Sequence, residues 1–183
     1  MMRYFLGFDL SAKDKLAIEH WRSISLPHFE RSIPAKNFHV TSVFLGQVTT
    51  TQLDLLTQSI EHCHENFKPF ELHLDQYGYW SKPKILWLGC SGNIQAATQI
   101  HGRLKELSQQ AGIVVSTKPY VPHVSIVRKA PNDPPSSLIA ADFKVNFDQL
   151  HLFESVSGKS GVQYPIRQSW RLNPFARPQP GKR

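Results

Sequence analysis

The sequence predicts an α+β fold of two similar lobes, each an antiparallel sheet with outer helices, with a cleft between them. Three observations carry this prediction. Hydrophobic residues make up 40% of the 183 residues and charged residues 19%, which is typical of a folded globular chain. Strand-type and helix-type segments alternate along the chain. Several short segments of the first half recur, with changes, in the second half.

The first half begins with an apolar and aromatic strand segment. Ser11, followed by Asp14 three positions later, then indicates the start of a helix. A segment rich in β-branched and aromatic residues follows two prolines, and apolar residues spaced by three and four come next. The expected strands are residues 3–9, 38–45, 70–76 and 84–89, and the expected helices are residues 11–24 and 53–67.

The second half repeats this alternation of elements. Apolar residues at helical spacing predict a helix over residues 94–111 that ends at Gly112. A strand is expected at residues 121–128, before a loop rich in Pro, Ser and Asn. Residues 143–153 and 163–172 predict a final antiparallel pair of strands.

Matching segments indicate a divergent duplication. The segment Phe70–Gln76 resembles 143–149, at an offset of 73 residues, and His39-Val-Thr resembles His123-Val-Ser, at an offset of 84. The pair Leu6-Gly7 resembles Leu88-Gly89, at an offset of 82. We therefore expect residues 1–172 to form one bilobal domain. Residues 173–183, with three prolines and three basic residues, are expected to form a mobile tail.

The net charge indicates the kind of partner, and the cysteines indicate the cellular compartment. The formal net charge is +7, from 21 Lys and Arg against 14 Asp and Glu, which favours an anionic partner such as nucleic acid. Cys63 and Cys90 form no CxxC pair, so a reducing compartment is the simpler expectation. No apolar run approaches the ~20 residues of a membrane span. We expect a cytoplasmic protein and, by default, a monomer.

Two histidine motifs carry the expected chemistry. Alternate residues of a strand share a face, so His39 and Thr41 point the same way, as do His123 and Ser125. Two such pairs facing one another supply two proton-transfer groups and two hydroxyl donors. This set of groups suits in-line opening of a cyclic phosphodiester, because one imidazole can activate water while the other protonates the leaving ribose oxygen. Neither a metal ion nor a cofactor is required.

The flanking residues make a family resemblance specific. NFHVTSVFLGQV around His39 and PYVPHVSIVRKA around His123 resemble the two-histidine (2H) phosphoesterase superfamily, and within it the bacterial RNA 2',3'-cyclic phosphodiesterases, also called 2'-5' RNA ligases. The resemblance implies hydrolysis of 2',3'-cyclic phosphate on RNA ends or nucleotides to a 2'-phosphate, with weak reversible 2'-5' joining. It implies that His39 is the proton donor and His123 the proton acceptor. Ser125 stands where many relatives have threonine, so its hydroxyl is retained.

Two further residues are candidates for substrate binding. Phe44 and Arg128 each lie five positions after a motif histidine. We expect Phe44 to pack on a base or ribose and Arg128 to donate to phosphate. An offset of five places them on the wrong face of a regular strand, so a bulge or a strand end must intervene.

Two other functions remain open from sequence alone. One is a non-catalytic module that binds RNA ends. The presence of two titrating groups argues against it, because binding alone does not need them. The other is a 2H phosphodiesterase for a different small cyclic phosphodiester, such as ADP-ribose cyclic phosphate or a nucleoside cyclic phosphate.

Overall fold

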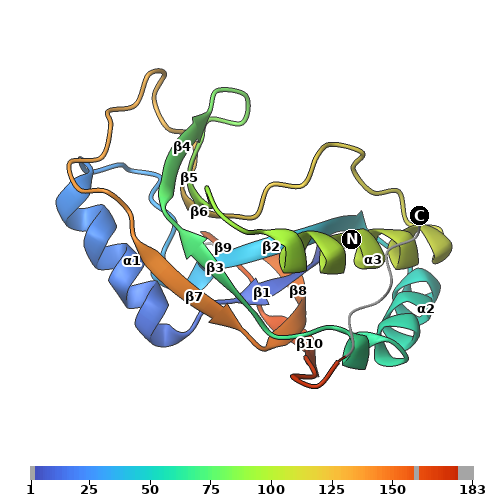
Figure 1. Cartoon of the computed structure of the whole chain (residues 1–183). Coiled ribbons are helices and arrows are strands. Elements are labelled where there is room, and N and C mark those ends of the chain that lie inside the picture. Colours follow the sequence, from blue (N-terminus) through green and yellow to red (C-terminus); the bar gives the residue numbers. More distant parts are fainter. Residues whose placement is uncertain (1–2, 159–160, 177–183) are drawn as a thin grey trace.

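The computed structural model describes residues 3–158 and 161–176 (Figure 1). The helices are α1 (Ala12–Ser25), α2 (Thr50–Glu61) and α3 (Gln95–Gln110), with short 3-10 turns η1 (Ala35–Asn37) and η2 (His64–Asn66). The strands are β1 (Arg3–Asp9), β2 (His39–Gln47), β3 (Phe70–Leu74), β4 (Gln76–Trp80), β5 (Ile85–Gly89), β6 (His123–Val127), β7 (Phe143–Phe147), β8 (Gln149–Gly158), β9 (Gly161–Gln163) and β10 (Ile166–Arg171). Ser11 caps α1 by accepting a hydrogen bond from the Asp14 backbone N–H, as predicted.

The main sheet confirms the α+β fold and its internal symmetry. Its strand order is β10-β8-β1-β2-β6-β5-β4, with β9 paired to β8, and every pairing is antiparallel. The order is mirrored about the junction of β2 and β6, where Val40 pairs with Val124. The two lobes are therefore two halves of one sheet, and the two histidine strands meet in the middle.

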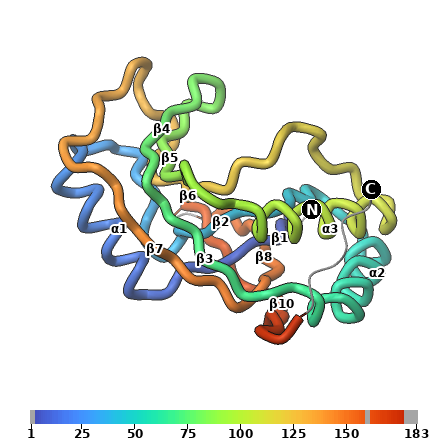
Figure 2. The backbone as a smooth tube through the Cα atoms, in the orientation of Figure 1, coloured from blue at the N-terminus to red at the C-terminus, as the bar shows by residue number. Residues whose placement is uncertain are grey.

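A second, two-stranded sheet joins the halves where the sequence repeats itself. β3 and β7 lie side by side (Figure 2) and pair in an antiparallel register centred on Leu72 and Val145. Both residues are buried. The prediction of one strand over residues 143–153 is wrong, because β7 and β8 belong to different sheets. Asp148 separates them, and its backbone carbonyl accepts a hydrogen bond from the Leu172 N–H. The predicted pairing of the last two long strands is confirmed, since β8 pairs with β10.

The register corrects one detail of the predicted duplication. Phe8 pairs with Val40 in the first half, and Leu88 pairs with Val124 in the second. The partners of the two histidine strands therefore correspond at an offset of 80 residues. The match of Leu6-Gly7 with Leu88-Gly89 is out of register by two. A similar dipeptide gives no information on register, which the backbone pairing sets.

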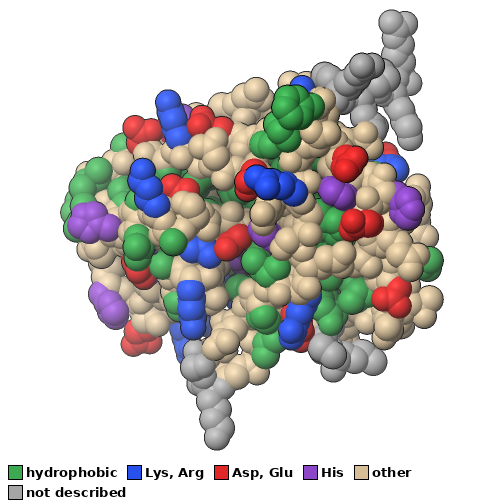
Figure 3. Space-filling view, turned by 90° about the horizontal axis from the view of Figure 1, so that it is seen from below, with side chains coloured by type: hydrophobic (Ala, Val, Ile, Leu, Met, Phe, Trp, Pro, Cys, Tyr) green, Lys and Arg blue, Asp and Glu red, His purple; other side chains and the backbone are tan. Residues whose placement is uncertain are grey.

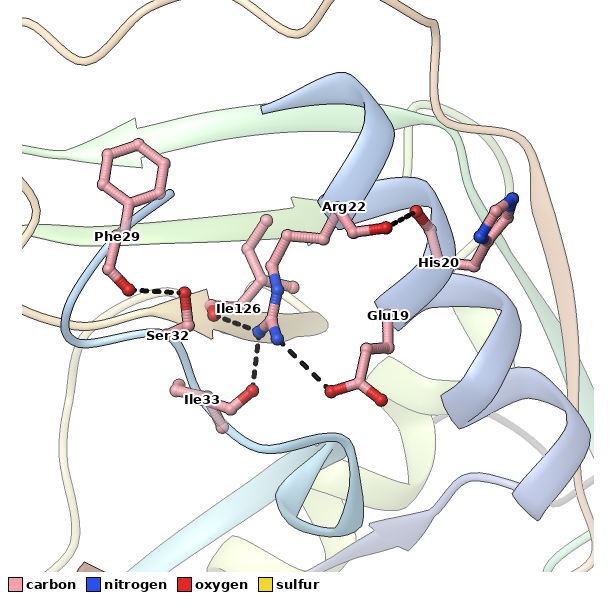
Figure 4. A network of polar contacts seen from close by, with 8 residues as sticks. Glu19, His20, Arg22, Phe29, Ser32, Ile33 and Ile126 are labelled. Carbon is pink, nitrogen blue, oxygen red and sulfur yellow. Dashed lines mark hydrogen bonds and ion pairs between the residues drawn. The ribbon is translucent and has the colours of Figure 1, made fainter. Parts of the chain in front are cut away.

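The first and third helices each contact the histidine strand of the other half. Arg22 of α1 donates from Nη1 to the carbonyls of Ile33, at 2.6 Å, and of Ile126 in β6, at 2.9 Å (Figure 4). In return, α3 packs on β2, where His101 Nδ1 lies 2.8 Å from the Ser42 carbonyl. Figure 1 shows α1 at one end of the molecule and α2 and α3 at the other. This exchange ties the two halves into one body.

The chain beyond β10 starts in contact with the body of the protein. The Asn173 N–H donates to the Phe67 carbonyl at 2.8 Å, and Ala176 is buried. The rest of the expected tail, residues 177–183, lies outside the described residues, and the boundary at residue 172 stays a prediction. Across residues 3–158 and 161–176, no helix is both long and apolar enough to span a bilayer. Cys63 and Cys90 are both free thiols.

Candidate active site

The two motif histidines begin β2 and β6 and are held in the same way. His39 Nδ1 lies 2.7 Å from the Asn37 carbonyl, and His123 Nδ1 lies 2.7 Å from the Val121 carbonyl. A carbonyl oxygen only accepts, so each Nδ1 carries the proton. In the neutral ring the lone pair is then on Nε2. The two halves thus fix both imidazoles in the tautomer that leaves Nε2 available for proton transfer.

His39 is enclosed by aromatic rings and bonded to its motif hydroxyl. Its Nε2 lies 3.0 Å from Thr41 Oγ1, and its ring centroid lies 4.8 Å from that of Phe5 and 5.0 Å from that of Tyr164. Burial lowers the pKa of His39 to about 4, and the positive charge of Arg128 adds to this effect. The Asn37 carbonyl opposes the shift. His39 is therefore neutral near pH 7 in the free protein.

His123 rests on a tryptophan pair. The Trp80 ring meets the imidazole edge to face at 4.5 Å, and Trp87 packs behind it, with ring centroids 5.0 Å apart. Trp87 needs the space beside two glycines, because a Cβ on Gly78 would lie 2.2 Å from its ring and one on Gly89 would lie 2.6 Å from it. Burial also lowers the pKa of His123, and the Val121 carbonyl opposes that shift.

Two matching bulges bring the later candidates onto the histidine face. In the pairing of β1 with β2, Leu6 faces Val43 and Gly7 faces Thr41, so Ser42 is the extra residue. In the pairing of β5 with β6, the register skips Ile126 in the same way. Each bulge lies three residues after a motif histidine and reverses the alternation that follows it.

All six candidate residues consequently line one cavity of about 430 Å³: His39, Thr41, Phe44, His123, Ser125 and Arg128. Thr41 is buried, and the Phe44 side chain is 64% exposed at the cavity wall. The Arg128 guanidinium donates to Tyr164 Oη at 2.5 Å. Arg3 also contributes to the lining, and none of the lining residues is Asp or Glu. The cavity therefore suits an anion with a flat or aromatic neighbour.

The residues that support the histidines are not among those predicted from the sequence. Trp80, Phe5 and Tyr164 all line the cavity and contact an imidazole or Arg128. Asn37 was missed as well, and its side-chain amide donates to the Val162 carbonyl at 2.8 Å, which anchors the start of β2. The glycines that make room for Trp87 give no signal in the sequence, because Gly78 faces Trp87 only through the pairing of β4 with β5.

The described ranges contain no group of three or more His, Cys, Asp or Glu side chains arranged to hold a metal ion. The site residues themselves are two imidazoles, two hydroxyls, one guanidinium and one phenyl ring. With both imidazoles in the Nδ1–H tautomer, this set of groups can move protons at two points around one bound anion.

The fold and the site together define a duplicated α+β protein in which paired strands present two imidazoles to one cavity. The family model of the 2'-5' RNA ligase superfamily matches residues 9–159. The chain therefore belongs to the 2'-5' RNA ligase superfamily, which confirms the resemblance found in the sequence.

Individual relatives agree with this assignment. The chain is 26% identical to an RNA 2',3'-cyclic phosphodiesterase of Escherichia coli over 174 residues, which cover 93% of this chain and 96% of the relative. The crystal structure of E. coli LigT complexed with 3'-AMP superposes with a TM-score of 0.82 at 26% identity, over 93% of this chain and 98% of that one. The structure of TT0787 of Thermus thermophilus, at 19% identity and a TM-score of 0.80 over 95% of this chain and 100% of that one, shares the fold.

Proposed function

We propose that this protein hydrolyses the 2',3'-cyclic phosphate at an RNA end to a 2'-phosphate, with His39 as proton donor and His123 as proton acceptor. The observation that carries the proposal is that both imidazoles, each in the tautomer with an unprotonated Nε2, line the same cavity. The names of the relatives, RNA 2',3'-cyclic phosphodiesterases, support the substrate. The same geometry also gives weak, reversible 2'-5' joining when an RNA 5'-hydroxyl takes the place of water as the nucleophile.

The reaction needs two proton transfers and no covalent enzyme intermediate. His123 Nε2 takes a proton from water as the water oxygen bonds to phosphorus. The bond from phosphorus to the 3' oxygen breaks on the opposite side, and His39 Nε2–H protonates that oxygen. Thr41 and Ser125 donate their hydroxyls to the non-bridging oxygens, and the charge of Arg128 stabilises the negative charge that develops there.

Substrate binding must change the protonation state of His39. The lowered pKa leaves His39 neutral in the free protein near pH 7, whereas a proton donor must be protonated. A phosphodiester anion against Nε2 favours the charged imidazole and raises its pKa. The positive charge of Arg128 works against this rise in pKa, so the bound anion supplies the difference. The site is thereby switched on by the charge of its substrate.

The pH dependence of kcat/KM follows from these shifts. This parameter reports the ionisations of the free enzyme, and the active form carries one proton on the histidine pair. Both pKa values lie below 6.5, with that of His39 at about 4. The rate constant should therefore rise with pH from about 4, reach its maximum on the acid side of pH 6.5, and fall at higher pH. A maximum above pH 7 would contradict the proposed desolvation of the pair.

The direct test is product identification on a defined substrate. We expect an oligonucleotide with a terminal 2',3'-cyclic phosphate to be converted to the 2'-phosphate in the presence of excess EDTA. Phosphorus NMR distinguishes the 2'-phosphate from the 3'-phosphate. Turnover restricted to cyclic mononucleotides would indicate another cyclic phosphodiester as substrate, and binding without turnover would indicate an RNA-end binding module.

We also propose that the protein acts as a cytoplasmic monomer without a metal ion or cofactor. The histidine pair supports the last point, because it supplies both proton transfers by itself. The two free cysteines, both partly buried, support a reducing compartment. Full activity after dialysis against EDTA and a sedimentation coefficient expected for a 20.9 kDa particle are the measurements that test these points.

A further inference from the structure

A second and larger cavity adjoins the histidine site. It has a volume of about 800 Å³ and lies between β2, the turn after β4, α3 and the segment 115–121. The two cavities share five lining residues: Thr41, Phe44, Trp80, Pro83 and His123. At about 430 Å³, the smaller cavity is near the lower end of the range of ~300–1,000 Å³ for small-molecule sites, and the larger is near the upper end. Together they have room for more than a mononucleotide.

The lining of the larger cavity combines flat rings with positive charge. Tyr120 stacks on His101 with ring centroids 4.2 Å apart and an angle of 2° between the rings. Lys82, Lys105 and Lys118 line the cavity, and none of the three forms a salt bridge within the described part of the chain. No Asp or Glu lines it. The face seen from below in Figure 3 differs, because basic and acidic side chains are interspersed there.

The wall of this cavity also holds hydrogen-bonding groups that the protein does not use. The hydroxyls of Ser42, Tyr79 and Tyr120 are buried and have no hydrogen-bond partner within residues 3–158 and 161–176. Buried polar groups are normally paired, because an unpaired one loses its interactions with water. Stacking faces, unpaired lysines and unused hydroxyls beside a phosphate site fit a nucleobase with its backbone phosphate.

We propose that the larger cavity binds the nucleotide immediately 5' of the terminal one, so that the protein selects polynucleotide ends over cyclic mononucleotides. This inference rests on the proposed function, because it takes the histidine cavity as the site of the cyclic phosphate. The base of the penultimate nucleotide enters beside Tyr120. The lysines face the phosphate that links it to the terminal nucleotide.

The test compares two substrates that differ by one nucleotide. We expect wild-type kcat/KM to be at least tenfold higher for the dinucleotide ApA 2',3'-cyclic phosphate than for 2',3'-cyclic AMP. The double variant Lys105→Gln, Lys118→Gln should lose at least fivefold on the dinucleotide and less than twofold on the mononucleotide. Its dependence on salt should weaken as well, since fewer counterions are released. Tyr120→Leu should cost about fivefold to a hundredfold on the dinucleotide alone.

The matched control removes two lysines outside both linings, with Lys13→Gln and Lys68→Gln, and should leave the preference intact. Equal losses on both substrates, or no preference in the wild type, would overturn the inference. A binding measurement tests the nucleotide site in the larger cavity independently of the proposed catalytic function. By calorimetry, ApA 2'-phosphate should bind at least tenfold more tightly than adenosine 2'-phosphate even if neither cyclic substrate is turned over. Equal affinities would refute the larger cavity as a nucleotide site.

Discussion

Replacing either His39 or His123 with alanine should lower kcat by about 10²–10⁴-fold while the protein stays folded. In the proposed mechanism each imidazole performs one of the two proton transfers. Among the described residues, no other histidine and no Asp or Glu lines the 430 Å³ cavity. The double variant should be only slightly worse than the weaker single variant, because residues that act as a unit are not additive. Single-turnover kinetics on a cyclic phosphate oligonucleotide measure the effect.

The control variant is His20→Ala, an exposed histidine of α1 outside the cavity, which should keep the wild-type rate. Thermal unfolding of all variants checks that the fold persists. If one of the two site variants kept more than a tenth of the wild-type rate, the acid–base scheme would be wrong for that residue.

A modified substrate assigns the two roles. Sulfur in place of the 3' oxygen gives a thiolate leaving group, which departs without a proton because its pKa is far lower than that of an alcohol. If His39 is the donor, the defect of His39→Ala should shrink by at least tenfold on this substrate, while that of His123→Ala should persist. The reverse pattern would exchange the roles of the two histidines.

The shared position of the two histidines and two hydroxyls could be predicted because its signals are local. A histidine and a hydroxyl two residues apart share a face in any regular strand. A single such histidine is more often an ordinary surface or core residue, but the repetition of the motif at His123 favours a functional site. The α+β class followed from the alternation of elements in the same way. The requirement for a bulge or a strand end before Phe44 and Arg128 also came from strand geometry alone, and a bulge is present in both strands.

The supporting residues could not be predicted because their contacts are tertiary. Trp80 lies on a different strand from His123, and only the register of β4, β5 and β6 brings the two rings together. Tyr164 follows β9 and reaches Arg128 across the cavity. Arg22 contacts the carbonyl of the bulge residue Ile126, 104 positions away in the sequence, and no spacing pattern within α1 predicts this contact. The sequence pattern indicates which face a residue occupies, while these partners depend on how the halves are joined.

The close contact of Gly7 with the backbone of β2 affects both the stability of the fold and the position of the site residues on β2. Gly7 lies in β1 opposite Thr41, next to the bulge at Ser42. A Cβ added there would lie 2.5 Å from the Val40 carbonyl oxygen and 3.2 Å from the Thr41 Cα. Both are backbone atoms, so no side-chain rotation can relieve the contact. β2 itself would have to move.

Gly7→Ala is therefore expected to destabilise the protein by about 1–3 kcal/mol, the usual cost of overpacking. For a chain of this size, each kcal/mol corresponds to a fall in Tm of roughly 2–4 °C. Because His39 and Thr41 move with β2, kcat should also fall, by up to ~10²-fold for a displacement of about 1 Å. The control is Gly102→Ala in the exposed middle of α3, where an added Cβ meets nothing within 4 Å. That change should stabilise the helix by about 1 kcal/mol and leave kcat unchanged. An unchanged Tm and kcat in Gly7→Ala would show that the spacing of β1 and β2 does not position His39.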